Sequence, residues 1–287
     1  MDTLLLTHLL NALCMIALPI GLALYLTTRW RLSGRLWLAG AATFLLSQAG
    51  HVPFNLGMSA LLNRTSLVSL SPAGQRAFNA AFLGLSAGLF EELFRWGMFR
   101  WWLKDARSWR RGVLAGVGHG GAEAILLGAL ALNGYVQLTA LRGADLSQLL
   151  PAGQVTQALR QISAYWSMPW YDSLLGTLER LLALPIQVAL SVLVLQALTR
   201  RQPAWVALAV AYHALVDAAA VLALPLGVYA TEAIVGGFAL VSLLLIALLR
   251  MPEPAPPPAP VRPAPPAAFA ATPLEETPET LADTRYV

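Results

Sequence analysis

The sequence predicts an all-α membrane protein, a polytopic bundle of about seven helices that cross the bilayer. Of its 287 residues, 57% are hydrophobic and 12% are charged, whereas a soluble domain usually has roughly 25% charged residues. Several apolar stretches reach the roughly 20 helical residues that the hydrocarbon core requires. Basic residues gather in alternate loops, a pattern typical of multi-pass proteins. These three observations agree on the fold class.

Seven stretches are long and apolar enough to be interpreted as spans. In chain order they are Leu4–Leu26, Leu36–Ala60, Asn79–Trp101, Gly112–Leu132, Leu178–Leu198, Pro203–Leu222 and Leu226–Leu249. No basic segment precedes the first, so we expect a retained helix rather than a signal peptide. Residues 133–177 are only mildly apolar and contain Trp166 and Trp170, which favours an outer loop with interfacial helical pieces, or a re-entrant segment.

Loop charges predict the orientation of the spans. One set of loops carries eleven basic residues, namely Arg29, Arg31, Arg35, Arg100, Lys104, Arg107, Arg110, Arg111, Arg200, Arg201 and Arg250. The alternate loops carry four, namely Arg64, Arg76, Arg142 and Arg160. Because the cytoplasmic side is the more basic, we expect a cell-membrane protein whose N-terminus is outside and whose C-terminus is cytoplasmic.

Composition divides the chain into a bundle over residues 1–250 and a tail over residues 251–287. Eleven of the nineteen prolines lie in this tail, so we expect it to be disordered in the cytoplasm. The net charge of +4 is spread among loops, which does not indicate a nucleic-acid partner. Cys14 is the single cysteine, which excludes an intrachain disulfide.

Ionisable side chains inside the predicted spans are the candidate functional residues, because each is costly in lipid unless it is paired or reached by water. They form three groups: Glu91, Glu92 and Arg95 in the third span, His119 and Glu123 in the fourth, and His213 and Asp217 in the sixth. Within each group the spacing of three or four residues places side chains on one helix face. Any one group alone is equally consistent with a structural ion pair.

The depths of these groups suggest a single site. At about 1.5 Å per residue, Glu91, His119 and His213 lie roughly 13, 12 and 18 Å from the cytoplasmic ends of their spans. We therefore expect the three spans to bring polar groups together in the inner half of the membrane. Gln187 falls at the level of His213 and is a candidate hydrogen-bond donor. Glu179-Arg180 lies some 30 Å from the cytoplasmic end of its span, so we expect it to cap or anchor its helix rather than to take part in catalysis.

The order and spacing of these motifs resemble the YhfC-type intramembrane proteases, from about Gln48 to Leu222. The motifs are Glu91-Glu92-x-x-Arg95, then Gly118-His119-Gly120-Gly121-Ala122-Glu123-Ala124, Glu179-Arg180 and His213-x-x-x-Asp217. That family is similar to the wider group containing CAAX-processing enzymes and PrsW-like proteases. The resemblance implies a membrane-embedded peptidase whose substrate is a membrane-associated peptide or protein.

Peptide hydrolysis in a membrane needs water, a base and a donor to the oxyanion. We expect Glu91 or Glu92 to be the base, with Arg95 orienting the other glutamate. His119 and His213 would position the water or stabilise the oxyanion, and Glu123 and Asp217 would orient them. A Zn²⁺ ion held by His119, Glu123, His213 and Asp217 is a second possibility, although the sequence has no HExxH motif.

Two other classes of function use the same side chains. A transporter would use the acids and histidines as a proton or cation relay, but no repeat between the two halves of the chain supports this alternative. A receptor or scaffold would use the buried charges for packing alone.

Overall fold

The computed structural model describes residues 2–62, 64 and 70–253, and the regular structure of these residues is helical throughout. This result confirms the predicted all-α class. The α-helices are α1 (Thr3–Trp30), α2 (Arg35–Leu62), α3 (Pro72–Gly97), α4 (Trp109–Ala140), α5 (Ala152–Ser167), α6 (Leu175–Thr199), α7 (Ala204–Ala223) and α8 (Val228–Leu248). A π-helical turn, Met98–Trp102, extends α3. Three short 3-10 turns are Leu146–Gln148, Asp172–Leu174 and Leu224–Leu226.

Five helical segments in the described part of the chain are long and apolar enough to cross a membrane: Thr3–Trp30, Trp109–Ala140, Asp172–Thr199, Ala204–Leu226 and Val228–Leu248. They agree with five of the predicted spans. α2 and α3 have 28 and 26 residues, and α3 carries charged side chains that lower its mean hydropathy. The count of seven spans and the orientation of the termini remain predictions.

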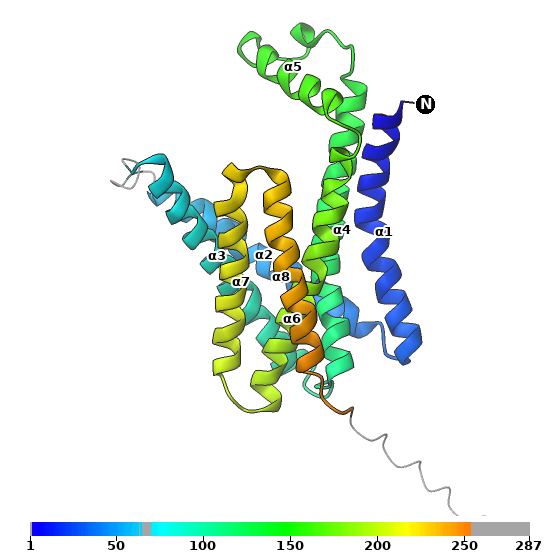
Figure 1. Ribbon diagram of the computed structural model, residues 1–287, viewed down its shortest axis with the longest axis vertical. Helices are drawn as coiled ribbons and strands as arrows, with labels where there is room; N and C mark the ends of the chain where they lie inside the picture. The colour runs from blue at the N-terminus through cyan, green and yellow to red at the C-terminus, as the bar shows by residue number, and fades with distance from the viewer. Residues whose placement is uncertain (1, 63, 65–69, 254–287) are drawn as a thin grey trace, which may run out of the picture. The chain divides into compact units, whose positions relative to one another are not determined.

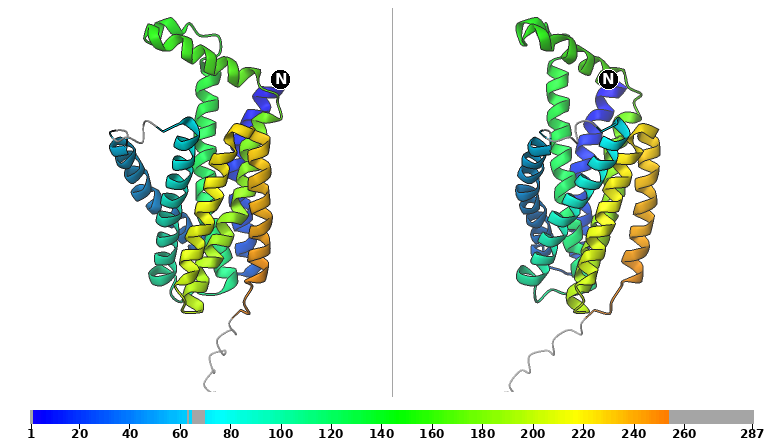
Figure 2. Two further views of the ribbon diagram at one scale, coloured as in Figure 1. Left: turned by 60° about the vertical axis from the view of Figure 1, so that its left-hand side comes forward. Right: turned by 90° about the vertical axis from the view of Figure 1, so that its left-hand side faces the viewer.

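Within residues 2–253, the long helices run side by side and α5 lies across one end of them (Figures 1 and 2). α3 packs mainly against α7, whereas α1 and α2 both pack against α4, and α4 packs against α6. α6 is the central helix, because nearly all of its side chains from Leu184 to Ala197 are buried. Neighbours in space are thus often far apart in sequence.

Glycines bring the helices carrying the candidate residues into close contact. A Cβ atom on Gly88 of α3 would lie 2.8 Å from the carbonyl oxygen of Val210 in α7, and one on Gly120 of α4 would lie 2.8 Å from Cβ of Gln187 in α6. A Cβ on Gly118 would collide with the backbone of Trp37 in α2. The glycine-rich run around His119 therefore allows α2 and α6 to approach α4 on two sides.

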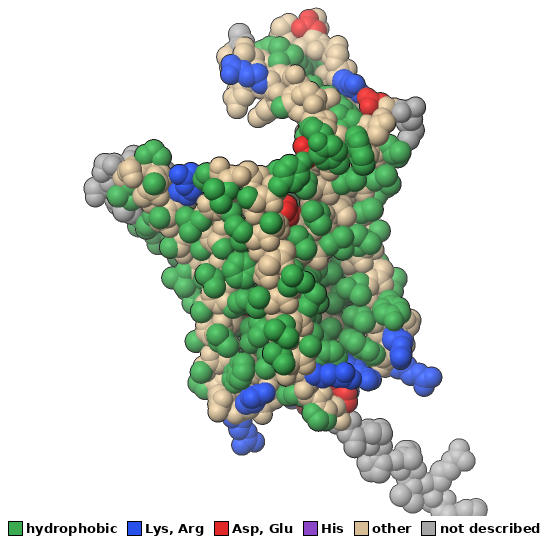
Figure 3. All heavy atoms as spheres, in the orientation of Figure 1, with side chains coloured by type: hydrophobic (Ala, Val, Ile, Leu, Met, Phe, Trp, Pro, Cys, Tyr) green, Lys and Arg blue, Asp and Glu red, His purple; other side chains and the backbone are tan. Residues whose placement is uncertain are grey.

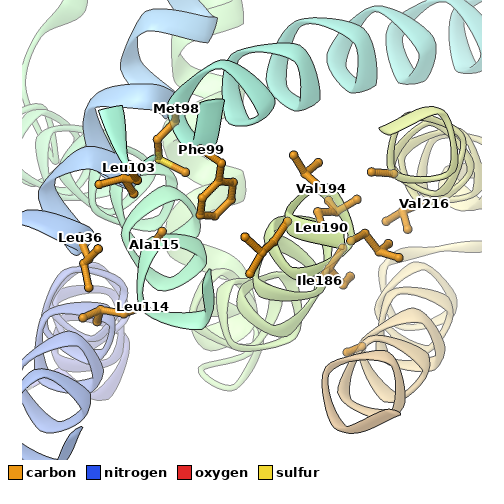
Figure 4. Close-up of a cluster of buried hydrophobic side chains, with 14 of the residues drawn as sticks. Leu36, Met98, Phe99, Leu103, Leu114, Ala115, Ile186, Leu190, Val194 and Val216 are labelled. Atoms are coloured by element: carbon orange, nitrogen blue, oxygen red, sulfur yellow. The ribbon is translucent and has the colours of Figure 1, made fainter. Parts of the chain in front are cut away.

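The largest apolar core of the described residues surrounds α6 and joins it to α4, α7, α8 and the π-helical turn after α3. Phe99, Leu114 and Leu190 are fully buried in it (Figure 4). The π-helical turn supplies Met98 and Phe99 to this core, while the last two residues of the turn, Trp101 and Trp102, are about half exposed or more. Close packing of this core fixes the register of the helices that carry the candidate site.

The segment between α4 and α6 contains α5, so residues 133–177 include helical structure as predicted, although α4 continues to Ala140. The interfacial location of α5 stays a prediction. His8 of α1 stacks on Tyr165 at a ring separation of 3.8 Å, and Trp166 donates from Nε1 to the carbonyl oxygen of Leu138. These contacts attach α5 to α1 and α4.

Hydrophobic side chains cover the middle of the face shown in Figure 3, and Lys and Arg cluster along the end where α8 finishes. This distribution suits a protein whose sides contact lipid. The predicted tail begins at residue 251, and its residues 254–287 lie outside the described part of the chain. Their predicted disorder stays a prediction.

Candidate active site

The two adjacent glutamates of α3 have different partners. Nη1 of Arg95 lies 2.8 Å from both carboxylate oxygens of Glu92, and Nδ1 of His213 lies 2.8 Å from Oε1. Glu92 and Arg95 are fully buried. Glu91 instead accepts from Nε2 of Gln48 at 2.9 Å and lies 3.0 Å from Nε2 of His119. Glu92 is thus neutralised by a buried cation, whereas Glu91 contacts an amide and an imidazole.

His213 of α7 lies between two carboxylates. Its Nδ1 contacts Glu92, and its Nε2 lies 3.6 Å from Oδ2 of Asp217. That second distance is too long for a hydrogen bond. The Asp217 side chain is 38% exposed, whereas that of His213 is 6% exposed, so Asp217 lies at the more accessible edge of this group. The predicted sharing of a helix face by these two residues agrees with the structure.

His119 of α4 is fully buried. Its Nε2 faces Glu91, its ring packs edge-on against Phe44 of α2, and its Nδ1 has no hydrogen-bond partner among the described residues. An unpaired buried polar atom is uncommon in a native protein. α3, α4 and α7 therefore bring Glu91, Glu92, His119 and His213 together, as the depth estimates anticipated.

Glu123 forms a second ion pair with Arg180 instead of contacting His119. Nη1 of Arg180 lies 2.6 Å from Oε1 of Glu123, and Arg180 also contacts its neighbour Glu179. The sequence predicted that Glu123 would orient a histidine and that Arg180 was too distant for the site. The prediction treated the helices as upright and level, and it left out the reach of the long arginine side chain from α6 to α4.

Gln187 connects the two ion pairs. Its Oε1 accepts from Nη2 of Arg95 at 2.6 Å, and its Nε2 donates to Oε2 of Glu123 at 2.9 Å. Nε2 also lies 3.5 Å from Oε2 of Glu91. The sequence placed this residue at the right level but did not indicate that it accepts from Arg95. A row of polar groups therefore runs from α3 through α6 to α4.

A further row of polar side chains on α2 reaches Glu91, and its member Gln48 was not among the residues singled out from the sequence. His51 lies 3.0 Å from Oγ of Ser86 and 2.9 Å from Nδ2 of Asn55. Its Nδ1 lies 3.4 Å from Oε1 of Gln48, which is the donor to Glu91. The spacing of Gln48, His51 and Asn55 along one helix face was the available signal.

The metal set predicted from the sequence, His119, Glu123, His213 and Asp217, is not assembled as one group. In the described part of the chain, no three His, Cys, Asp or Glu side chains gather as a metal-binding cluster. Glu123 is held by Arg180 and Gln187 instead of lying beside His119. The carboxylate next to His119 is that of Glu91, which corrects the set taken from sequence.

Comparison with known proteins gives a family match over most of the chain. A family model described as YhfC intramembrane metalloprotease matches residues 14–239. The "Uncharacterized membrane protein YhfC" of Bacillus subtilis (strain 168) is 34% identical over 212 residues, which cover 71% of this chain and 79% of that protein. No solved structure matches the chain significantly.

Proposed function

Because this chain belongs to the YhfC intramembrane metalloprotease family and is a multi-pass integral membrane protein, we propose that it hydrolyses a peptide bond of a membrane-associated protein or peptide, with Glu91 as the general base. One observation carries this assignment: Glu91 lies 3.0 Å from His119, while Glu92 is paired with Arg95. The proposal thus selects one of the two glutamates that the sequence left open.

The partners of the two carboxylates support the choice of Glu91. A carboxylate held by a buried guanidinium is stabilised as the anion and is a poor proton acceptor. Glu92 has such a partner on α3 and a further contact to His213. The Glu91 side chain is 8% exposed, and its contacts to Gln48 and His119 orient it without a permanent cation in direct contact. It is therefore the glutamate better suited to exchange a proton with water.

Hydrolysis then follows from the chain's own side chains. Glu91 takes a proton from water as the water oxygen bonds to the scissile carbonyl carbon, and it returns that proton to the amide nitrogen as the C–N bond breaks. Nδ1 of His213 donates to Glu92, and Nε2 has no hydrogen bond to Asp217 at 3.6 Å, so in the imidazolium form its Nε2–H is available to the oxyanion. Glu92 and Arg95 fix the orientation of His213.

The family description implies a metal, and the chemistry of the donors beside Glu91 suits Zn²⁺. Imidazole nitrogens and a carboxylate are its usual catalytic ligands, and a metal-binding histidine commonly bonds a carboxylate through its other nitrogen, as His213 does with Glu92. His119, His213 and Glu91 offer donors of these kinds, yet among the described residues they do not gather as a metal-binding cluster, so the steps given above use side chains alone. Bound Zn²⁺ would polarise the attacking water.

Comparative proteomics of membrane peptides tests the proposal. Cells carrying the wild type are compared with cells carrying Glu91→Gln, and Glu232→Gln is the matched control. Glu232 lies on α8, and its Oε2 has no hydrogen-bond partner among the described residues. We expect fragments that disappear in Glu91→Gln and persist in the control. Unchanged fragments, together with a pH-driven flux in proteoliposomes that Glu91→Gln abolishes, would favour a transporter.

A further inference from the structure

A basic pocket lies at the end of the bundle that the charge pattern predicts to be cytoplasmic. It has a volume of about 360 Å³ and lies between the α1–α2 connection, the π-helical turn after α3 and the start of α4. Arg31, Arg35 and Arg111 line it, together with one acidic residue, Asp105. Leu36 and Leu103 of the apolar core (Figure 4) form part of its wall.

The charges of this pocket are not compensated by neighbouring side chains. Among the described residues, none of its arginines belongs to an ion pair. Arg111 donates from Nη1 to the backbone oxygen of Asp105 at 3.2 Å. Three guanidinium charges minus one carboxylate charge leave two positive charges. α2 begins at Arg35 in the wall, and the helix terminus adds positive potential. The pocket is therefore suited to an anion.

An apolar groove adjoins the pocket through a shared residue, Trp102. The groove has a volume of about 410 Å³ and is lined by Leu46 of α2, Leu93 and Phe94 of α3, and Trp101. Each of these side chains is at least 39% exposed. From Trp102 to Leu93 the helix rises about 13 Å, so the groove leads from the basic end toward the middle of the bundle.

We propose that this combined site binds an anionic glycerophospholipid. The guanidinium groups would hold the phosphate, and one acyl chain would cover the apolar groove. Tryptophan side chains such as Trp102 favour the boundary between headgroup and hydrocarbon, which is where the two parts of the site meet. A soluble phosphate would leave the groove uncovered, and a substrate helix would leave the arginines without an anion. The lipid alone matches both.

Lipid binding is measured on the full chain in detergent by native mass spectrometry, with phosphatidylglycerol and phosphatidylcholine as probes. We expect retention of phosphatidylglycerol and roughly tenfold weaker binding in Arg31→Gln/Arg35→Gln. The matched control is Arg29→Gln/Arg201→Gln, which removes the same charge at the same end outside the pocket. Arg31 and Arg201 both have a positive φ, 53° and 55°, so the two pairs carry the same backbone strain.

The groove is tested separately with Leu46→Trp, which fills it, against Leu45→Trp, whose position is 54% exposed and outside the groove. Only Leu46→Trp is expected to lower retention of phosphatidylglycerol. Equal retention of the two lipids, equal losses in both arginine pairs, or full displacement by inorganic phosphate would each overturn the proposal. Because no readout is cleavage, these results are independent of the proposed peptidase activity.

Discussion

Nη2 of Arg95 donates a 2.6 Å hydrogen bond to Oε1 of Gln187, a residue 92 positions later in the chain. The amide nitrogen of Gln187 donates in turn to Glu123. This one neutral side chain joins the Glu92–Arg95 pair of α3 to the Glu123–Arg180 pair between α4 and α6. A long-range contact of this kind fixes how three helices are oriented around Glu91.

Gln187→Leu is expected to destabilise the protein and to reduce cleavage. The change leaves a buried guanidinium nitrogen without its acceptor, at a cost of about 1–3 kcal/mol, and frees Arg95 to shift relative to Glu92. Unfolding in detergent and peptide cleavage are measured together. Gln196→Leu is the matched control, because Gln196 is buried on the same helix but bonds to Val192 and Arg200. Equal loss of cleavage in both variants would contradict the role given to Gln187.

Glu91→Gln is expected to lower mainly the cleavage rate, whereas Glu92→Gln is expected to lower mainly the stability of the protein. Glu91→Gln removes the base but leaves the Glu92–Arg95 pair intact, so we expect cleavage to fall by roughly 10²- to 10⁴-fold with little loss of stability. Glu92→Gln leaves buried Arg95 without its counter-ion, which costs about 3–5 kcal/mol. Cleavage rate and denaturant midpoint, measured for each variant, distinguish the roles. A stable, inactive Glu92→Gln with an active Glu91→Gln would reverse the assignment.

The Glu123–Arg180 pair is expected to stabilise the helix packing rather than to take part in the reaction. A double-mutant cycle with Glu123→Gln and Arg180→Gln should give a coupling free energy of about 0.5–3 kcal/mol. The exposed pair Asp2–Arg142, whose side chains are 42% and 48% exposed, is the reference and should give a smaller coupling free energy because solvent screens it. A Glu123→Gln variant as inactive as Glu91→Gln would instead place Glu123 in the chemistry.

Gly88→Ala is expected to push α3 away from α7 and so separate Glu92 from His213. The added Cβ would lie 2.8 Å from the carbonyl oxygen of Val210, and such overpacking costs about 1–3 kcal/mol. Gly237→Ala on α8 is the control, because no atom lies within 4 Å of its added Cβ. Thermal unfolding of both variants checks the difference. A neutral Gly88→Ala would show that this contact does not hold the helices together.

The length of the apolar stretches and the three- or four-residue spacing of the polar side chains were sufficient to predict the long helices and the three polar groups on α3, α4 and α7. Each span is a local pattern, and the residues of each group lie three or four positions apart in sequence. The partners of these groups were harder to predict. Glu123 pairs with Arg180, 57 positions away, and that choice depends on helix tilt and side-chain reach, which a count of residues along upright helices omits.

The polar side chains on α2 also show that local patterns are predictable from the sequence whereas long-range partners are not. Gln48, His51 and Asn55 share a helix face, although Pro53 lies between them in the sequence. The structure keeps Pro53 inside α2, and Gln48 becomes a partner of Glu91. Likewise, the basic residues at positions 31, 35 and 111 were counted as markers of orientation. Their convergence around one pocket depends on how α1, α2 and α4 end and begin beside one another.

The length of α4 has a practical consequence. Its 32 residues span about 48 Å, well beyond the roughly 30 Å of hydrocarbon, and Figure 1 shows it continuing past its neighbours toward α5. The loop that follows this end of α4 is therefore suited to labelling from one side of the membrane. With Cys14 replaced by serine, a lone cysteine at exposed Leu149 would react with an impermeant maleimide on intact cells only if this end faces outward. The result of that labelling would decide whether the arginine-lined end of the bundle faces the cytoplasm or the outside of the cell.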